Sequence, residues 1–202
     1  MSPPEPFTVI TKVPIPDSLP PARVIAALQT YEALITPNPY LLRYERRPVK
    51  VEEVVNDPFF LEDGKKLQAF VVSERVPIIP GVGSWATKDI AIPCVFQSFE
   101  YGVRCCAQAQ GGVTVRSSYE VRRQGEVRDG TESQDVVYGG DHYELVDIST
   151  IECGALVKPF VKMRFSAGHQ ALLRQVIADL LQSGTSRVAA SRLSRTQNDN
   201  HR

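Results

Sequence analysis

The order in which hydrophobic patterns follow one another along the 202 residues constrains the fold more than any single motif. Tight-turn pairs, Tyr101-Gly102 and Gly111-Gly112, separate consecutive β-rich segments and favour hairpins between them. Consecutive strands joined by short links predict an antiparallel meander. The predicted strands, about six to seven of them, are 7–15, 41–47, 67–76, 85–99, 103–110, 113–122 and 142–153.

Two helical patterns flank this meander. The first follows Asp17 or Ser18, either of which can cap a helix, and it ends at Thr36-Pro37 because a residue before proline leaves the helical region. The second runs over 156–182, carries Pro159 in its first turn and stops at Gly184. This order predicts an α+β fold in which a curved antiparallel sheet wraps around the long C-terminal helix. Such a sheet leaves an elongated apolar cavity, where a hydrophobic small molecule would bind.

Composition predicts one globular domain. Hydrophobic residues make up 43% and charged residues 23%, which suffices for a core. We expect a flexible N-terminus at 1–6, a single domain at 7–184 and a disordered basic tail at 185–202. The net charge of zero opposes nucleic-acid binding. Neither a secretory signal nor an apolar run of about 18 residues is present, so we expect a cytoplasmic protein without stable membrane insertion.

Known cofactor and metal motifs are missing. The four cysteines form no C-x-x-C pair, and the three histidines are not at zinc spacing. The chain has no nucleophile elbow, phosphate loop, dinucleotide fingerprint or H-E-x-x-H motif. We therefore expect no metal and no cofactor, and the pattern disfavours hydrolases, kinases and nicotinamide enzymes.

The alternation of side chains predicts which residues face the cavity. In 113–122, Ser117 and Tyr119 fall on the apolar face, so they are polar side chains on an inward surface, whereas the alternate set should lie in water. That outward set is Thr114, Arg116, Ser118, Glu120 and Arg122. In 103–109, small residues including Cys105 face inward, which leaves room for a ligand, and Cys106 faces outward. For 85–99 both phases stay open, and Pro93 suggests a bulge.

Two ionisable residues are candidates for proton transfer. If Tyr143 faces inward, so does Asp147, and burial would raise the pKa of that carboxyl group. The alternative is a solvated or hydrogen-bonded Asp147. His169 shares the helix stripe of Leu173, which faces the sheet, and could exchange a proton with a bound carbonyl compound. The alternative is a core histidine with a satisfied hydrogen bond. His142, at the entrance of a strand, could lie at the mouth of the cavity, but we interpret it as a histidine of a surface loop.

The candidate site therefore has two groups of residues. The catalytic candidates are His169, Tyr119, Asp147 and Ser117. The candidates for substrate binding are Trp85, Phe96, Cys105, Tyr143, Phe165 and Leu173. Trp85 follows the Gly81–Gly83 turn, where it could line or gate the entrance.

Four segments carry a family resemblance: Phe7-Thr8-Val9-Ile10-Thr11 with Val13-Pro14, Leu34-Ile35-Thr36-Pro37-Asn38-Pro39, Tyr143-Glu144-Leu145-Val146-Asp147, and 154–162. With the order of elements, they resemble the helix-grip fold of the START, polyketide-cyclase and birch-pollen-allergen (SRPBCC) superfamily, and within it a fungal family of unknown function. The resemblance covers 7–182. It implies a hydrophobic ligand and no cofactor, and it transfers no catalytic residue.

Two functions from different classes follow. The first is a cofactor-independent cyclase or isomerase of a polyketide- or terpenoid-like intermediate in secondary metabolism, which orients its substrate and aids it by acid–base catalysis. The second is a non-catalytic carrier or sensor of a lipid or sterol, with 78–87 and 123–142 as gates. Two or more inward ionisable groups near a common point would favour the enzyme, and an aliphatic lining would favour the carrier. A homodimer is compatible with either function.

Overall fold

The computed structural model describes residues 5–55, 57–61, 65–77, 87–125 and 142–199, and side-chain surroundings within these ranges except at 65, 76, 77 and 184–199. Seven strands form one antiparallel sheet in the order β1-β7-β6-β5-β4-β3-β2. The strands are β1 (Phe7–Ile15), β2 (Leu41–Arg47), β3 (Lys65–Pro77), β4 (Thr87–Phe99), β5 (Gly102–Ala109), β6 (Val113–Arg123) and β7 (Tyr143–Glu152). The chain crosses from β1 at one edge to β2 at the other and then returns strand by strand, so the predicted meander is confirmed.

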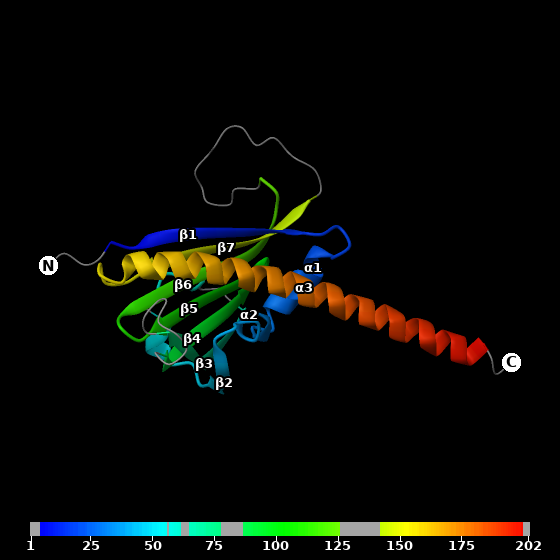
Figure 1. Cartoon of the computed structure of the whole chain (residues 1–202), viewed down its shortest axis with the longest axis horizontal. Helices are drawn as coiled ribbons and strands as arrows, with labels where there is room; N and C mark the ends of the chain where they lie inside the picture. The colour runs from blue at the N-terminus through cyan, green and yellow to red at the C-terminus, as the bar shows by residue number, and fades with distance from the viewer. Residues whose placement is uncertain (1–4, 56, 62–64, 78–86, 126–141, 200–202) are drawn as a thin grey trace.

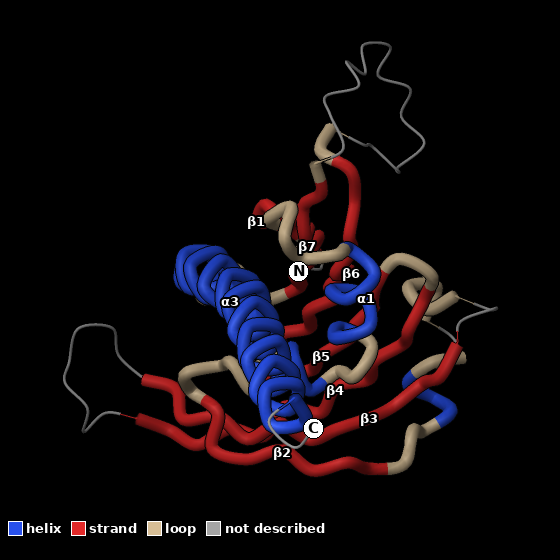
Figure 2. The backbone as a smooth tube through the Cα atoms, turned by 90° about the vertical axis from the view of Figure 1, so that its right-hand side faces the viewer, coloured by secondary structure: helices blue, strands red, loops and turns tan. Residues whose placement is uncertain are grey.

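The helices are α1 (Pro21–Leu28), α2 (Glu32–Ile35) and α3 (Lys158–Asp199), with a 3-10 turn, η1 (Val51–Glu53). The sheet is curved, and α3 crosses its concave side (Figure 2), which is the predicted helix-grip arrangement. In Figure 1, α3 runs along β1 and β7 and extends beyond the sheet. Within the described residues, no helix combines the length and apolar character needed to cross a bilayer.

The single helix predicted over 17–36 is wrong, because Tyr31 divides it into α1 and α2. Tyr31 has φ of 67°, a left-handed conformation that interrupts a helix. The Tyr31 ring is fully buried and stacks on Phe96 at 5.3 Å between ring centroids. Its hydroxyl lies 2.8 Å from Ser98 Oγ. Tertiary contacts therefore set this backbone conformation. The predicted capping by Asp17 or Ser18 is also wrong, since α1 has no side-chain cap and begins with a proline.

The terminal helix is longer than predicted. Pro159 lies in its first turn as expected, because the missing N–H of proline costs nothing there. Gly168 does not interrupt α3, and the helix continues past the predicted stop at Gly184 to Asp199. A glycine in a helix interior costs only a moderate amount of free energy, so a single glycine does not end the helix.

The sheet has buried side chains on both faces. On the concave face, α1, α2 and α3 pack over a core that includes Phe70, Leu145 and Leu173, each fully buried. On the convex face, Cys106 and Val95 pack beneath the segment that carries Phe59 and Phe60. Cys106 faces outward as predicted, yet it is only 5% exposed. Burial raises its pKa to about 11.

Two sequence-based expectations about the strands are wrong. The outward side chains of β6 were expected in water, but Ser118, Glu120 and Arg122 are at most 9% exposed. Glu120 accepts hydrogen bonds from Ser118 Oγ at 2.5 Å and Arg122 Nε at 2.8 Å, so this charge pair is partnered in its buried position. Pro93 marks no bulge, because its pairing with Val71 continues the regular register of β3 and β4.

Candidate functional site

Asp147 is the most buried ionisable side chain on the concave face of the sheet. It lies in the middle of β7, opposite Tyr119 on β6 and Thr11 on β1. Asp147 is 0% exposed, and it shares its face with Leu145, which belongs to the concave-face core. The structure therefore shows that Asp147 faces inward, a point that the sequence left open. The carboxylate is also hydrogen-bonded, which agrees with the alternative interpretation of Asp147 as a hydrogen-bonded residue.

A chain of hydrogen bonds leads from the sheet to α3 through this carboxylate. Ser117 Oγ and Ser149 Oγ lie 2.6 Å apart, and Ser149 Oγ donates to Asp147 Oδ1 at 2.6 Å. Asp147 Oδ2 lies 2.5 Å from Nδ1 of His169. Both serines are at most 2% exposed. Each oxygen of the carboxylate thus has a partner, which is the condition under which a buried charge is tolerated.

His169 stacks with two aromatic rings. Its ring stacks on Phe165, one turn earlier on α3, at 3.7 Å between centroids. The rings of His169 and Tyr119 are 6.2 Å apart between centroids, with an interplanar angle of 12°. The His169 side chain keeps 18% of its surface exposed, whereas Asp147 keeps none. The carboxylate and the stacked rings therefore fix the imidazole while part of it stays open to solvent.

Tyr119 is a buried, neutral phenol. Desolvation raises its pKa well above the usual value, and the negative charge of Asp147 acts in the same direction. Tyr119 is 5% exposed and Ser117 is 2% exposed. Both sequence-predicted residues face inward, as expected. They adjoin the Asp147–His169 pair rather than an open surface.

Glu74 is a second carboxylate on the concave face, and it was not among the residues predicted from the sequence. It projects from β3 on the same side as Val72 and Phe70, which lie two and four residues earlier. Asn38 Nδ2 donates to Glu74 Oε1 at 2.7 Å. Desolvation raises the pKa of Glu74, while the hydrogen bond from Asn38 and the charge of His169 lower it. An acidic residue on the apolar side of an alternating strand was the available signal. The same signal marks Ser149, which shares the face of Asp147.

Half-buried apolar side chains continue the concave face toward one end of the sheet. Ala107 lies opposite Cys94 and Val115, and Val115 lies opposite Ile151 at the end of β7. The half-buried set on this part of the face is Ile90, Ile92, Ala107, Val113 and Val115. Because β7 leads from this end into α3, the apolar set and the start of α3 lie at the same end of the molecule (Figure 1).

The predicted substrate-binding residues divide between core and site. Phe96 and Leu173 are core residues at 4% and 0% exposure, so neither lines an open space. Cys105 is 8% exposed on the concave face, and contact with Cys94 and desolvation raise its pKa well above the usual value. Of the proposed set, Phe165 stacks on His169. Trp85 and most of the two predicted gates lie outside the described residues.

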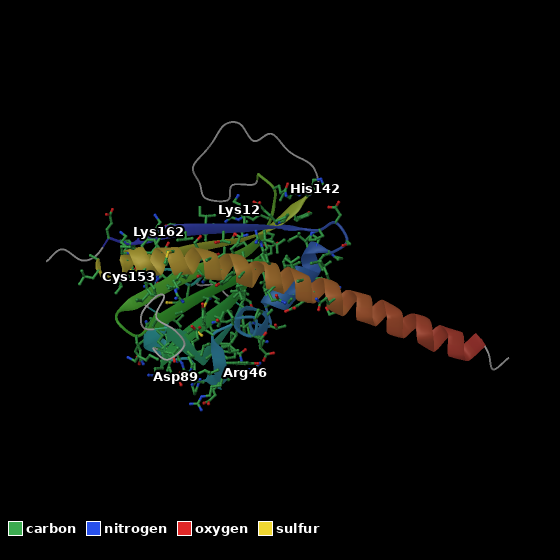
Figure 3. The ribbon with its side chains drawn as sticks, viewed as in Figure 1. Lys12, Arg46, Asp89, His142, Cys153 and Lys162 are labelled. Carbon is green, nitrogen blue, oxygen red and sulfur yellow. The ribbon has the colours of Figure 1, made fainter. Side chains whose placement is uncertain are left out.

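Tyr143 lines a hollow that differs in place from the cavity predicted between the sheet and α3. This cavity, about 290 Å³ in volume, lies where β1 leads into α1. It is lined by Ile15, Pro16, Asp17, Leu19, Pro21, His142 and Tyr143. His142 Nδ1 lies 3.1 Å from Asp17 Oδ1, and both side chains are largely exposed (Figure 3). His142 is therefore a surface histidine, as interpreted, and it also lines this hollow.

The site around His169 consists of groups suited to binding and proton transfer. Within the part of the chain that the structure describes, no group of three or more His, Cys, Asp and Glu side chains is arranged to hold a metal ion. A carboxylate at Nδ1 fixes the tautomer in which Nδ1 carries the proton and Nε2 has a free lone pair. In that state His169 can accept a proton at Nε2, and Asp147 stabilises the imidazolium that results.

Comparison with solved structures gives one match that supports the fold and two weaker similarities. The chain is similar to TTHA0849 from Thermus thermophilus, with a TM-score of 0.52 and 12% identity over 88% of this chain and 99% of that chain. Ara h 8.0201 matches at a TM-score of 0.48 and 12% identity, over 88% and 99% of the two chains. The hypothetical protein jhp0584 from Helicobacter pylori matches at 0.49 and 14%, over 85% and 86%. At such identities only the fold can be compared.

Sequence comparison places the chain in a family. A search of curated protein sequences finds no significant match. A family model described as "Domain of unknown function (DUF7053)" matches residues 4–182, which include all seven strands and the part of α3 that covers the sheet. The expectation of a family of unknown function is thereby confirmed, while its fungal origin stays a prediction. The chain belongs to the DUF7053 family.

Proposed function

We propose that this protein binds a hydrophobic small molecule against the concave face of the sheet and moves a proton on it with His169. The observation that carries this proposal is the Asp147–His169 pair, 2.5 Å apart and fixed by a buried serine chain, beside half-buried apolar side chains. Carboxylate-held histidines are effective proton acceptors near neutral pH. The function is that of a cofactor-independent cyclase or isomerase, and the substrate class is a polyketide- or terpenoid-like carbonyl compound.

The proposed reaction begins with removal of a proton next to a carbonyl group. Nε2 of His169 takes the proton from the α-carbon, and the electron pair of the C–H bond moves to the carbonyl oxygen to give an enolate. Asp147 stabilises the imidazolium. Burial raises the pKa of Glu74. In its protonated form Glu74 could donate a hydrogen bond or a proton to the substrate oxygen.

Two outcomes complete the reaction. Return of the proton from Nε2 to a different carbon isomerises the substrate. Attack of the enolate carbon on a second carbonyl carbon closes a ring, and the proton on Nε2 then passes to the new alkoxide. The apolar surface contributes by holding a flexible substrate in a reactive shape.

A carrier or sensor of a lipid or sterol is the second candidate. The burial of Ser117 and Tyr119 favours it, because these hydroxyl groups adjoin the Asp147–His169 pair and leave fewer polar groups to meet a ligand. Binding would then be the same, without proton transfer.

Hydrogen–deuterium exchange on a hydrophobic ketone separates the two functions. We would incubate the protein with α-tetralone in D2O and follow loss of the α-protons by NMR, with binding measured separately by native mass spectrometry. The cyclase or isomerase proposal expects faster exchange with the wild type and a loss of at least about 100-fold in His169→Phe, which keeps the ring stack. The matched control is His142→Phe, an exposed histidine away from the site.

Each result has a meaning for the proposal. Binding without exchange supports the carrier. Equal exchange rates for wild type and His169→Phe would remove His169 from the mechanism. Absence of any bound hydrophobic compound, both in freshly purified protein and after incubation with a panel of ketones and lipids, would contradict both functions.

A further inference from the structure

Apolar side chains are unusually exposed where β7 leads into α3. Leu156 is 98% exposed, Met163 64% and Val157 41%. Residues 154–157 form the turn before α3, and Met163 lies seven residues, or two helical turns, after Leu156. Leu156 and Met163 therefore both lie near the start of α3, and both face solvent. A leucine with almost its whole surface in water is unfavourable unless another surface covers it.

Basic residues dominate the chain segment that carries these apolar residues. Residues 153–178 contain Lys158, Lys162, Arg164 and Arg174 and no Asp or Glu, although the whole chain has zero net charge. Lys158 Nζ donates to the carbonyl oxygen of Glu5 at 3.0 Å and lies over the ring of Phe7. Among the described residues, neither Lys158 nor Lys162 forms an ion pair with a carboxylate. Their charges are thus available to an anionic partner.

We propose that Leu156, Val157, Lys158, Lys162 and Met163 form a docking surface for membranes that contain anionic lipids. Lysines attract the negatively charged headgroups, and the exposed apolar side chains enter the boundary between headgroups and acyl chains. This is peripheral binding, which agrees with the lack of a membrane-crossing helix among the described residues. The combination of basic and apolar exposed residues favours a lipid surface over an acidic protein, which would not need Leu156.

The docking surface lies near the concave face that would bind the ligand, which is a structural reason for docking at this place. The surface lies at the end of the sheet where the concave face carries half-buried Ala107, Val113 and Val115. Figure 3 places Lys162 and Cys153 at this end, beside the start of α3. Docking would turn this half-buried apolar part of the concave face toward the lipid. The inference goes beyond the proposed function and its test does not depend on any ligand.

Vesicle co-sedimentation of the full chain tests the proposal. The vesicles are phosphatidylcholine alone or phosphatidylcholine with about 30% phosphatidylserine; an anionic leaflet adds roughly a few-fold in affinity per basic residue. We expect at least tenfold tighter binding to the anionic vesicles, reversed by high salt. Lys162→Glu and the double variant Leu156→Gln/Met163→Gln should each weaken binding by about tenfold.

The controls match each change on exposed residues elsewhere. Val55→Gln removes an apolar side chain that is 71% exposed, and Lys88→Glu reverses an exposed charge on β4. All variants change exposed side chains, and circular dichroism checks that each one folds. Equal binding to both vesicle types, or variants of the docking surface that bind like the controls, would overturn the proposal. A concentration-dependent dimer that Leu156→Gln/Met163→Gln dissociates, without vesicle binding, would overturn it in favour of a second copy of the chain.

Discussion

The hydrogen bond between Asp147 and His169 should be worth a measurable coupling energy. Asp147→Asn keeps the shape of the side chain and removes its charge, and His169→Phe keeps a ring against Phe165, 3.7 Å away between centroids. The two groups lie 2.5 Å apart, with Asp147 0% and His169 18% exposed, so solvent screens them little. Hydrogen bonds to charged groups contribute about 1.5–3 kcal/mol. We therefore expect a coupling of about 2 kcal/mol in the free energy of unfolding.

A double-mutant cycle measures this coupling. Urea unfolding of the wild type, both single variants and the double variant at pH 7 gives four unfolding free energies. The losses of stability in the two single variants should add up to more than the loss in the double variant, because each single change leaves a buried partner unsatisfied. A coupling below about 0.5 kcal/mol would refute the reasoning, since Asp147 would then not hold the imidazole and the basis of the proposed proton transfer would be lost.

Three further outcomes follow from local surroundings. Gly102→Ala should destabilise the protein by roughly 3 kcal/mol or prevent folding, because a Cβ there would overlap the backbone carbonyl oxygen of Tyr119 on β6. Gly168→Ala has open space around it and should stabilise the protein by about 0.5–1 kcal/mol. Thermal or urea unfolding measures both changes. Burial raises the pKa of Glu74 above its ordinary 4.5, so the folded protein keeps this proton to higher pH than the unfolded chain does. The stability of the wild type should therefore fall as the pH rises from 4.5 through the folded pKa. Urea titrations at several pH values should show that Glu74→Gln removes this loss. At pH 8 all four buried thiols, including Cys106 with its pKa of about 11, should react slowly with Ellman's reagent until the protein is unfolded; rapid labelling of the native protein would contradict the burial.

Local periodicity accounts for what could be predicted about the site. Alternation along β6 placed Ser117 and Tyr119 inward, and the helical stripe through Leu173 placed His169 toward the sheet. Both are properties of a single element, so they can be interpreted without knowing its neighbours. The phase of β7 stayed open because both of its faces are buried, at Asp147 and at Val146 alike.

The amino-acid sequence by itself determined the order of strands and helices, the meander and the inward side of most strands, because backbone geometry repeats every two or 3.6 residues. Only the tertiary structure decided that Tyr31 breaks the first helix, that Cys106 is covered on the convex face, and that Glu74 and Asp147 approach His169 from different strands. These features depend on packing and hydrogen bonds between residues far apart in the chain. Periodicity within an element carries no information about which distant partner will meet it.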